Sequence, residues 1–259
     1  MWFEESLIAP GLRRITEGGF VHTYLLEGSE RAVLVDSGFG IGDIGAVVKG
    51  LTAKPILVVN THGHLDHVGG NSHFDVTLLH QAESLKDAAD SAPRFREAAA
   101  QEDFPVPFPE GFKPSQYAPQ VPEPTHRVAG GEVIDLGGRA LEVLPTPGHT
   151  IGSICLLEES NRFLFTGDTV MDRPLQGIGE GVSLSVYQDS LQMLAGMAPD
   201  LDLILPGHGP SPLPAATLSE LAECARQLDQ SAFCDMNLSG RKTAGMNVGR
   251  FVFFLALRR

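Results

Sequence analysis

Short apolar runs, each closed by a turn rich in Gly, Pro or Asp, are the main pattern of this chain. Residues 20–27 and 31–36 are rich in β-branched and aromatic side chains and predict two strands joined by a turn. Apolar residues at helical spacing predict a helix over 41–51. The run 55–59 is continuously apolar, which is typical of a strand buried on both faces. Strands joined both by hairpins and by helices predict mixed α/β layers.

The same criteria carry through the remainder of the chain. They predict strands over 76–79, 132–136, 139–144, 153–157, 162–165 and 201–205, and helices over 81–89, 186–197 and, after its prolines, 213–232. Residues 250–257 are expected to form an edge strand or a segment that caps the core. No short-period repeat and no sharp break in composition divides the sequence. We therefore predict a single domain over residues 1–259.

Residues 93–124 have a different texture, with eight prolines, mixed charge and scattered aromatic side chains. A long stretch with little periodicity is either functional, as a lid over a site, or partly disordered. Its aromatic residues favour a packed segment over a linker, because disordered linkers are poor in them. Two interpretations stay open: a lid that shapes an apolar pocket, and a loop that packs on the core without a catalytic role.

Net charge and composition argue against several classes of binding partner. The net charge of −13 argues against nucleic acid and against anionic lipid, because both would be repelled. The first residues lack the basic and apolar regions of a secretory signal, and the longest apolar run, 251–257, is too short to span a bilayer as a helix. Three widely spaced cysteines, Cys155, Cys224 and Cys234, fit buried, reduced thiols. We expect a cytoplasmic protein that acts on a small molecule.

The stretch 60–70 holds most of the chemistry. Three histidines and a carboxylate fall within six residues, His62, His64, Asp66 and His67, directly after the apolar run 55–59. Alternate side chains of an extended backbone point the same way, so His62 and His64 can converge on one point. Imidazole and carboxylate without thiolate are donors that zinc and similar divalent ions accept. This stretch predicts metal binding.

Three later loops repeat the arrangement of an apolar strand, a Gly or Pro turn and a metal-binding side chain. They supply His149, Asp168 and His208. Ligands after successive strands are where layered α/β folds place their sites. Seven donors are too many for one tetrahedral ion, and they suit two metals that share a carboxylate.

These motifs together resemble the signature of the metallo-β-lactamase-fold hydrolases. The matching segments are Thr-His-Gly-His-Leu-Asp-His at 61–67, Pro-Gly-His-Thr at 147–150, Phe-Thr-Gly-Asp at 165–168 and Pro-Gly-His-Gly at 206–209, with Asp36 in Leu-Val-Asp-Ser-Gly. The resemblance covers roughly residues 20–212. It implies an α/β (α+β) fold in four layers, an αβ/βα sandwich of two sheets with helices outside.

The resemblance also implies a role for each matching residue. His62, His64 and His149 would hold one metal, while Asp66, His67 and His208 would hold the other and Asp168 would bridge them. Asp36 would hydrogen-bond the histidine loop without being a ligand. Zinc is the expected metal, with manganese and iron also compatible. His22, His73, His80 and His126 match no ligand position and are expected to be structural or surface residues.

The implied activity is hydrolysis of an ester, thioester or lactone by a hydroxide that bridges two metals, with Asp66 orienting it or passing a proton to the leaving group. Asp168 places the chain with the glyoxalase II and lactonase branch, although residues 169–177 lack the glutathione-binding segment of glyoxalase II, and Met171 stands where lactonases tend to carry Tyr. Tyr187 is expected to pack or cap its helix. The alternatives are a β-lactam hydrolase and a mononuclear-iron persulfide dioxygenase of the same fold.

Overall fold

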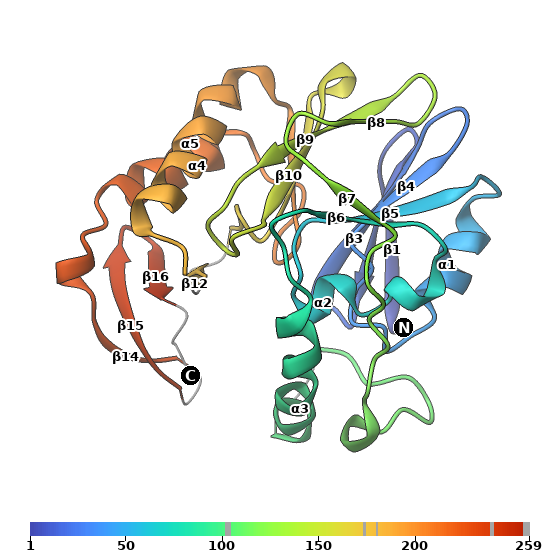
Figure 1. Ribbon diagram of the computed structural model, residues 1–259, viewed down its shortest axis with the longest axis horizontal. Coiled ribbons are helices and arrows are strands. Elements are labelled where there is room, and N and C mark those ends of the chain that lie inside the picture. Colours follow the sequence, from blue (N-terminus) through green and yellow to red (C-terminus); the bar gives the residue numbers. More distant parts are fainter. Residues whose placement is uncertain (102–104, 173–174, 180, 239–240, 256–259) are drawn as a thin grey trace. The chain divides into compact units, whose positions relative to one another are not determined.

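The computed structural model describes residues 1–101, 105–172, 175–179, 181–238 and 241–255. The chain divides into two compact units, Met1–Val143 and Leu144–Arg259, and each is described by itself below. Among the described residues the strands form three sheets, accompanied by helices (Figure 1). The predicted mixed α/β class is therefore confirmed, whereas the prediction of a single domain stays a prediction.

The first unit contains a seven-stranded sheet in the order β1-β2-β3-β4-β5-β6-β7. Its strands are β1 (Phe3–Ala9), β2 (Leu12–Glu17), β3 (Val21–Glu27), β4 (Ala32–Val35), β5 (Ile56–Asn60), β6 (Thr77–His80) and β7 (His126–Val128). Strands β1 to β4 pair antiparallel, while β4 to β7 pair parallel. The carboxyl ends of β4, β5 and β6 consequently lie along one edge of this sheet, where α/β proteins place their sites.

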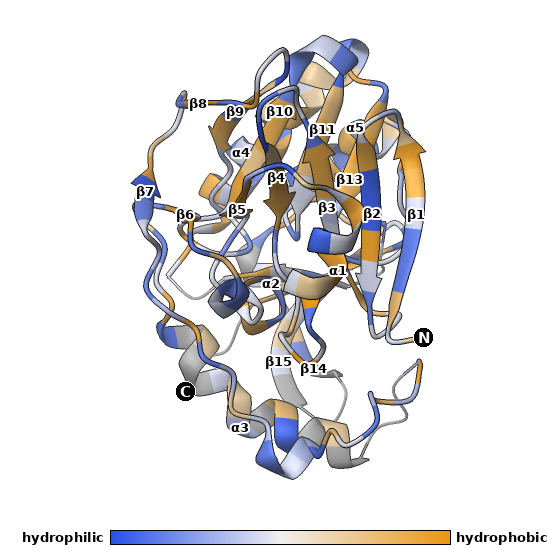
Figure 2. Cartoon of the chain, turned by 90° about the vertical axis from the view of Figure 1, so that its right-hand side faces the viewer, coloured by the Kyte–Doolittle hydropathy of each residue, from blue (hydrophilic) through white to orange (hydrophobic). Residues whose placement is uncertain are grey.

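An apolar core explains these strands. Ile15, Leu25, Leu34 and Val58 are fully or almost fully buried and form one cluster with helix α1 (Ile44–Leu51). Asp43 caps that helix, since its carboxylate accepts a hydrogen bond from the backbone N–H of Ala46 at 2.8 Å. Figure 2 shows β4 in the colours of hydrophobic residues along its length, as expected for a strand buried on both faces.

The helix expected over 81–89 is wrong in its bounds. Helix α3 spans Lys86–Gln101, so the first part of the proline-rich stretch 93–124 is helical, with Pro93 inside the helix and exposed. Buried Ala88, Ala92 and Ala99 recur at helical spacing, and the first two pack against Leu65 of the short helix α2 (Leu65–Val68). This packing stabilises a helix that a proline would otherwise end.

The later part of that stretch is packed on the first unit. A 3₁₀ turn, η2 (Pro114–Gln116), leads into Tyr117, which is buried in the same cluster as Ala88. The ring of Tyr117 lies 4.5 Å from that of Phe95 on α3 and 5.9 Å from that of Phe112, measured between centroids. These contacts support a packed segment, and its role as a moving lid stays a prediction. Residues 102–104 lie outside the described part.

The second sheet has the order β13-β11-β10-β9-β8. It contains β8 (Val133–Asp135), β9 (Ala140–Pro145), β10 (Ile154–Glu158), β11 (Phe163–Gly167) and β13 (Leu203–Pro206), and the division between the two units falls inside β9. Strands β11 and β13 are parallel, with Gly167 opposite Pro206. Both strands thus end at the same edge, which brings the residues that follow them together.

Two helices and a four-stranded sheet complete the second unit. Helices α4 (Leu184–Met197) and α5 (Ala216–Arg226) lie side by side in Figure 1 and share an apolar core. The helix predicted within 213–232, after the prolines, is too long at its carboxyl end. At its carboxyl end, the side chain of Asp229 accepts hydrogen bonds from the N–H and hydroxyl of Ser231, a local turn that competes with helix.

The third sheet has the order β12-β16-β15-β14. Its strands are β12 (Leu175–Ile178), β14 (Cys234–Leu238), β15 (Arg241–Val248) and β16 (Phe251–Leu255), of which only the last was predicted. Cys155 and Cys224 are buried, as expected, but Cys234 is exposed at the start of β14, the strand at the edge of the sheet. The expectation of three buried thiols is therefore wrong for Cys234.

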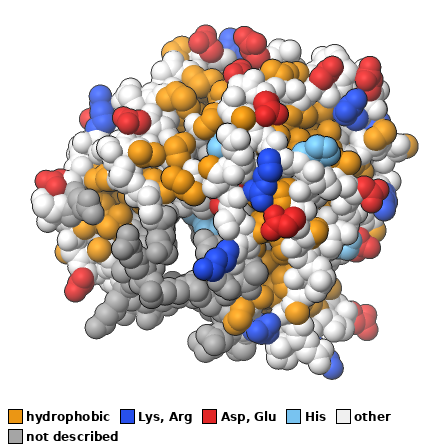
Figure 3. All heavy atoms as spheres, in the orientation of Figure 1, with side chains coloured by type: hydrophobic (Ala, Val, Ile, Leu, Met, Phe, Trp, Pro, Cys, Tyr) orange, Lys and Arg blue, Asp and Glu red, His pale blue; other side chains and the backbone are white. Residues whose placement is uncertain are grey.

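Among the described residues, the helices are all too short or too polar to traverse a lipid bilayer. Acidic and basic side chains are interspersed on the face drawn in Figure 3, without a continuous basic area.

Candidate metal centre

The histidine motif begins where β5 ends, at the sheet edge described above. Residues 61–64 continue from the strand, and helix α2 follows at once. The rings of His62 and His64 turn toward each other, with Nε2 of His62 3.1 Å from Nδ1 of His64. Two nitrogens bound to one tetrahedral zinc at about 2.0–2.1 Å each would lie about 3.3 Å apart. The spacing of these two nitrogens therefore suits ligands of a common ion.

A single buried carboxylate, Asp36, controls the orientation of two of the histidines. Its Oδ2 lies 2.8 Å from Nδ1 of His67 and accepts a 2.8 Å hydrogen bond from the hydroxyl of Thr61. Because Thr61 donates its one proton to Asp36, its oxygen accepts from Nδ1 of His62, 3.1 Å away. Both rings then carry their proton on Nδ1 and leave Nε2 with a lone pair, the form that binds metals.

Asp36 itself has an unusual backbone. Its φ is 61°, in the left-handed region that non-glycine residues seldom adopt. Its Oδ1 also accepts a 2.7 Å hydrogen bond from the N–H of Thr61. The side chain is 2% exposed, so these bonds replace those that water would make. Strain of this kind, fixed by several buried bonds, is frequent at functional sites.

Helix α2 presents the next two candidates. Asp66 and His67 are neighbours on this helix, with Oδ2 of Asp66 3.8 Å from Nε2 of His67. The side chain of His67 is fully buried, whereas that of Asp66 is 21% exposed. The carboxylate of Asp66 can therefore contact solvent or a small ligand, whereas His67 is buried and its Nδ1 is bonded to Asp36.

Backbone contacts fix the carboxyl end of α2. The carbonyl oxygen of His67 accepts hydrogen bonds from the N–H of Ser37 at 2.8 Å, the hydroxyl of Ser37 at 3.1 Å and the amide of Asn60 at 2.8 Å. The amides of Asn60 and Asn71 also bond each other, with distances of 2.8 and 3.2 Å. This network was not predicted. The sequence did offer a signal for it, because Asn60 directly follows the apolar run 55–59 and Asn71 directly follows Gly69-Gly70.

The second unit brings its three candidates together as well. His149 and His208 each place Nε2 3.5 Å from Oδ2 of Asp168. The exposed side-chain fractions are 15% for His149, 9% for Asp168 and 3% for His208. Asp168 follows β11 and His208 follows β13, and the N–H of Gly207 donates to the carbonyl of Gly167 at 2.8 Å. The parallel pairing of these strands thus explains why the two residues meet.

The loop that carries His149 is held against helix α4. A Cβ on Gly148 would overlap the ring of Tyr187, and the hydroxyl of Ser190 donates to the carbonyl of Pro147 at 2.7 Å. Tyr187 is 1% exposed, and burial raises its pKa. It packs beneath the loop, as one of the two roles expected for it, and sequence reasoning did not connect it with Gly148.

Within each unit the predicted ligands lie together: His62, His64, Asp66 and His67 in the first, and His149, Asp168 and His208 in the second. Their donors are imidazole nitrogens and carboxylate oxygens, which fit zinc, manganese or iron(II). The other histidines are not members of the possible metal-binding groups found among the described residues. His22 is buried with its Nδ1 3.0 Å from the hydroxyl of Thr16, and His126 is exposed.

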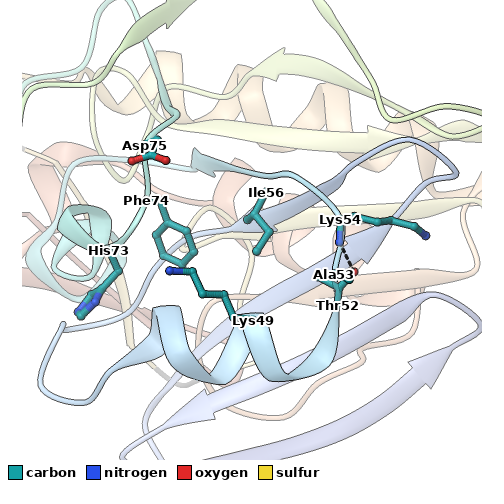
Figure 4. A pocket seen from close by; sticks show the side chains of 8 residues that line it. All are labelled: Lys49, Thr52, Ala53, Lys54, Ile56, His73, Phe74 and Asp75. Atoms are coloured by element: carbon teal, nitrogen blue, oxygen red, sulfur yellow. Dashed lines mark hydrogen bonds between the residues drawn. The ribbon is translucent and has the colours of Figure 1, made fainter.

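A separate cavity of about 370 Å³ lies at the opposite end of β5 (Figure 4). Its lining includes Lys49, Lys54, His73, Phe74 and Asp75. The Nζ of Lys54 is 3.6 Å from Glu27, and Nδ1 of His73 is 3.2 Å from Asp43. Two side chains of its lining thus contact neighbouring carboxylates, and none of its residues is among the predicted metal ligands.

Comparison with known proteins identifies the family. The model of the metallo-beta-lactamase superfamily matches residues 16–208. The acyl-coenzyme A thioesterase MBLAC2 of Bos taurus is 31% identical over 229 residues, which cover 80% of this chain and 81% of that protein. The atrochrysone carboxyl ACP thioesterase of Aspergillus fumigatus is 26% identical over 80% of this chain and 58% of its own length.

Solved structures show the same fold. A metallo-beta-lactamase from Pontibacter korlensis superposes with a TM-score of 0.62 at 21% identity, covering 87% of this chain and 100% of the other. The family match covers most of the chain and includes the seven predicted ligands and Asp36. This chain belongs to the metallo-beta-lactamase superfamily.

Proposed function

We propose that this protein is a metal-dependent thioesterase that hydrolyses an acyl group from a thiol carrier. The observation that carries the proposal is the arrangement around Asp36, which presents metal-binding nitrogens of His62 and His67 at the carboxyl edge of the sheet. Carboxylate–histidine pairs of this kind are the usual support of metal ligands. Family membership supplies the reaction class, the breaking of a bond by water.

We assign the ligands of two ions. His62, His64 and His149 would hold one ion, while Asp66, His67 and His208 would hold the other. Asp168 would be shared, which agrees with its nearly equal distances from His149 and His208 within the second unit. Zinc is the metal to expect first, because every donor is a nitrogen or carboxylate oxygen, and manganese or iron(II) would also be accepted.

When bound, two divalent ions supply a water molecule activated near neutral pH and polarise the acyl carbonyl. The Asp66 carboxylate is 21% exposed, so we assign it to orient the attacking water and to pass its proton to the leaving sulfur. The water oxygen adds to the acyl carbon, the carbon–sulfur bond breaks, and an acid and a thiol are released. Asp36 keeps His62 and His67 in the tautomer that leaves Nε2 for metal.

The names of the relatives reduce the number of substrate classes to consider. The bovine and fungal proteins are both named as thioesterases, and a relative from Haemophilus influenzae, 29% identical over 54% of this chain, is named hydroxyacylglutathione hydrolase GloC. All three names describe thioester cleavage. Residues 169–177, which were expected to disfavour glutathione, lead us to favour acyl-coenzyme A or acyl-carrier-protein thioesters.

The test begins with metal analysis of purified protein, followed by turnover of acetyl, octanoyl and palmitoyl coenzyme A, S-lactoylglutathione, a homoserine lactone, an aryl ester and a chromogenic cephalosporin. We expect two equivalents of metal and the highest kcat/KM on an acyl-coenzyme A. The His64→Ala and Asp168→Ala variants should lose metal and turnover together, whereas His126→Ala, which changes an exposed histidine, should keep both.

Other results would favour the remaining members of the fold. Hydrolysis of the cephalosporin alone would indicate a β-lactamase. One equivalent of iron with oxygen consumption on a persulfide would indicate the dioxygenase. Full thioesterase activity in the metal-free His64→Ala variant would refute the proposal.

A further inference from the structure

A buried carboxylate outside the proposed ligand set lies near the histidine motif. Glu17, the last residue of β2, is 1% exposed. Its Oε1 accepts hydrogen bonds from the indole of Trp2 at 2.9 Å and from the N–H groups of Ile41 and Gly42 at 3.2 Å each, and its Oε2 accepts from the N–H of Phe39 at 2.6 Å. Burying a carboxylate is costly, so four accepted bonds indicate that it has a specific task.

That task is to hold the loop 38–42. Three of the four donors are backbone N–H groups of this loop, those of residues 39, 41 and 42. The carboxylate of Glu17 therefore ties the loop to the end of β2. The hydroxyl of buried Tyr117 donates to the carbonyl oxygen of Phe39 from the other side. The loop is therefore fixed both from β2 and from the 105–124 segment.

The loop in turn supports helix α2. A Cβ on Gly69 would overlap the carbonyl oxygen of Phe39, and a Cβ on Gly40 would overlap the carbonyl oxygen of Gly69. The two backbones thus touch without side chains between them. Helix α2 has only four residues, too few to be stable alone, so its position depends on what it packs against.

We propose that Glu17 is a positioning residue, which holds loop 38–42 against α2 and thereby sets Asp66 and His67 for the second metal. The inference rests on the proposed function, because it takes these two residues as ligands. His62 and His64 continue directly from β5, so Glu17 should affect their ion much less. A loss of affinity at the second metal site that exceeds the loss at the first is therefore the result that this role predicts.

The test is the Glu17→Gln variant, compared with wild type by metal titration at 15 °C and by hydrogen exchange. An amide cannot accept at both of its ends, so at least one of the four donors would face another donor. We expect affinity for the second ion, assigned to Asp66, His67 and His208, to fall about tenfold, the lower end of the effect of outer-shell partners on metal sites. Affinity for the first ion should change less than twofold, and exchange of the amides at 67–70 should accelerate.

Glu27→Gln is the matched control, because Glu27 accepts from the hydroxyl of Thr52 at the opposite end of the same sheet. It should leave both ions and the exchange at 67–70 unchanged. Tyr117→Phe removes only the bond to Phe39 and is the milder variant, with an expected twofold to fivefold loss at the second ion. It also serves if Glu17→Gln does not fold.

The possible outcomes separate the two proposals. Equal weakening of both ions in Glu17→Gln, or unchanged exchange at 67–70, would show general destabilisation or no coupling and would overturn the inference alone. Wild-type protein that binds no metal would overturn the proposed function and, with it, the role assigned to Glu17.

Discussion

Replacing Asp36 by Asn tests whether one carboxylate prepares two histidines for metal. The change preserves shape but puts an NH₂ group on one end of the side chain. At Oδ2 that group would oppose the donors Nδ1–H of His67 and the Thr61 hydroxyl, and at Oδ1 it would oppose the N–H of Thr61. With the proton of His67 on Nδ1, either orientation of the amide therefore leaves a buried donor facing a donor.

The expected loss follows from the contacts. Outer-shell partners of metal-binding histidines are worth about 10–100-fold in affinity, which is about 1.4–2.8 kcal/mol per ion. Because Asp36 reaches His67 directly and His62 through Thr61, we expect both ions to weaken by this factor. The metal-free protein should also lose about 1.5–3 kcal/mol of stability, the range for a buried hydrogen bond to a charged group.

Competition with a chromogenic chelator measures the two affinities, and urea unfolding of chelator-treated protein measures stability. Asp135→Asn is the control, because Asp135 is exposed and accepts only a turn N–H from Gly137 at 2.9 Å among its described bonds. Wild-type affinity for both ions in Asp36→Asn would show that the tautomers do not depend on this carboxylate, and the reasoning would fail.

Three further predictions concern packing and thiols. Gly148→Ala should lower the stability of the fold by about 1–3 kcal/mol, because the added methyl group overlaps Tyr187, and this loss appears as a lower Tm. The control Gly196→Ala, which has open space on helix α4, should be neutral or slightly stabilising. Equal Tm values for the two variants would refute the overlap. Leu34→Ala should lose about 2–5 kcal/mol in urea unfolding because Leu34 is fully buried, and exposed Leu7→Ala should stay within about 0.5 kcal/mol. At pH 8 a disulfide reagent should label Cys234 quickly and leave Cys155 unlabelled, since burial raises the pKa of Cys155 to about 12; rapid labelling of Cys234→Ser would contradict this.

Local signals made part of the fold predictable. Strands such as β3, β4 and β5 are short apolar runs that end at turns, so their residue types alone indicated them. Strand β1 was missed because Glu4 and Glu5 interrupt its apolar pattern, and both are exposed. Strand β12 was missed because its partner β16 lies more than seventy residues further along the chain. Helix α3 was cut short by the weight given to Pro93, which tertiary packing overrides.

The candidate site likewise contains residues that the sequence indicated and residues that it did not. The metal-type side chains stand in short motifs and were visible in the sequence, and their assignment to two ions stays a prediction. Glu17 was not visible, because its four donors come from residue 2 and from residues 39–42 and meet only in the folded chain. Nothing in the local pattern around residue 17 distinguishes a buried anchor from a surface glutamate.

The seam between loop 38–42 and the end of α2 has a consequence for protein engineering. Gly40 and Gly69 meet there as bare backbone, and Gly70 makes the same kind of approach to the carbonyl oxygen of Ser37. Any side chain at these positions would push the two segments apart, so a library randomised there should yield mainly inactive clones. Diversity aimed at new substrates belongs elsewhere, for example at the partly exposed positions of 105–116, which can change without separating the two backbones.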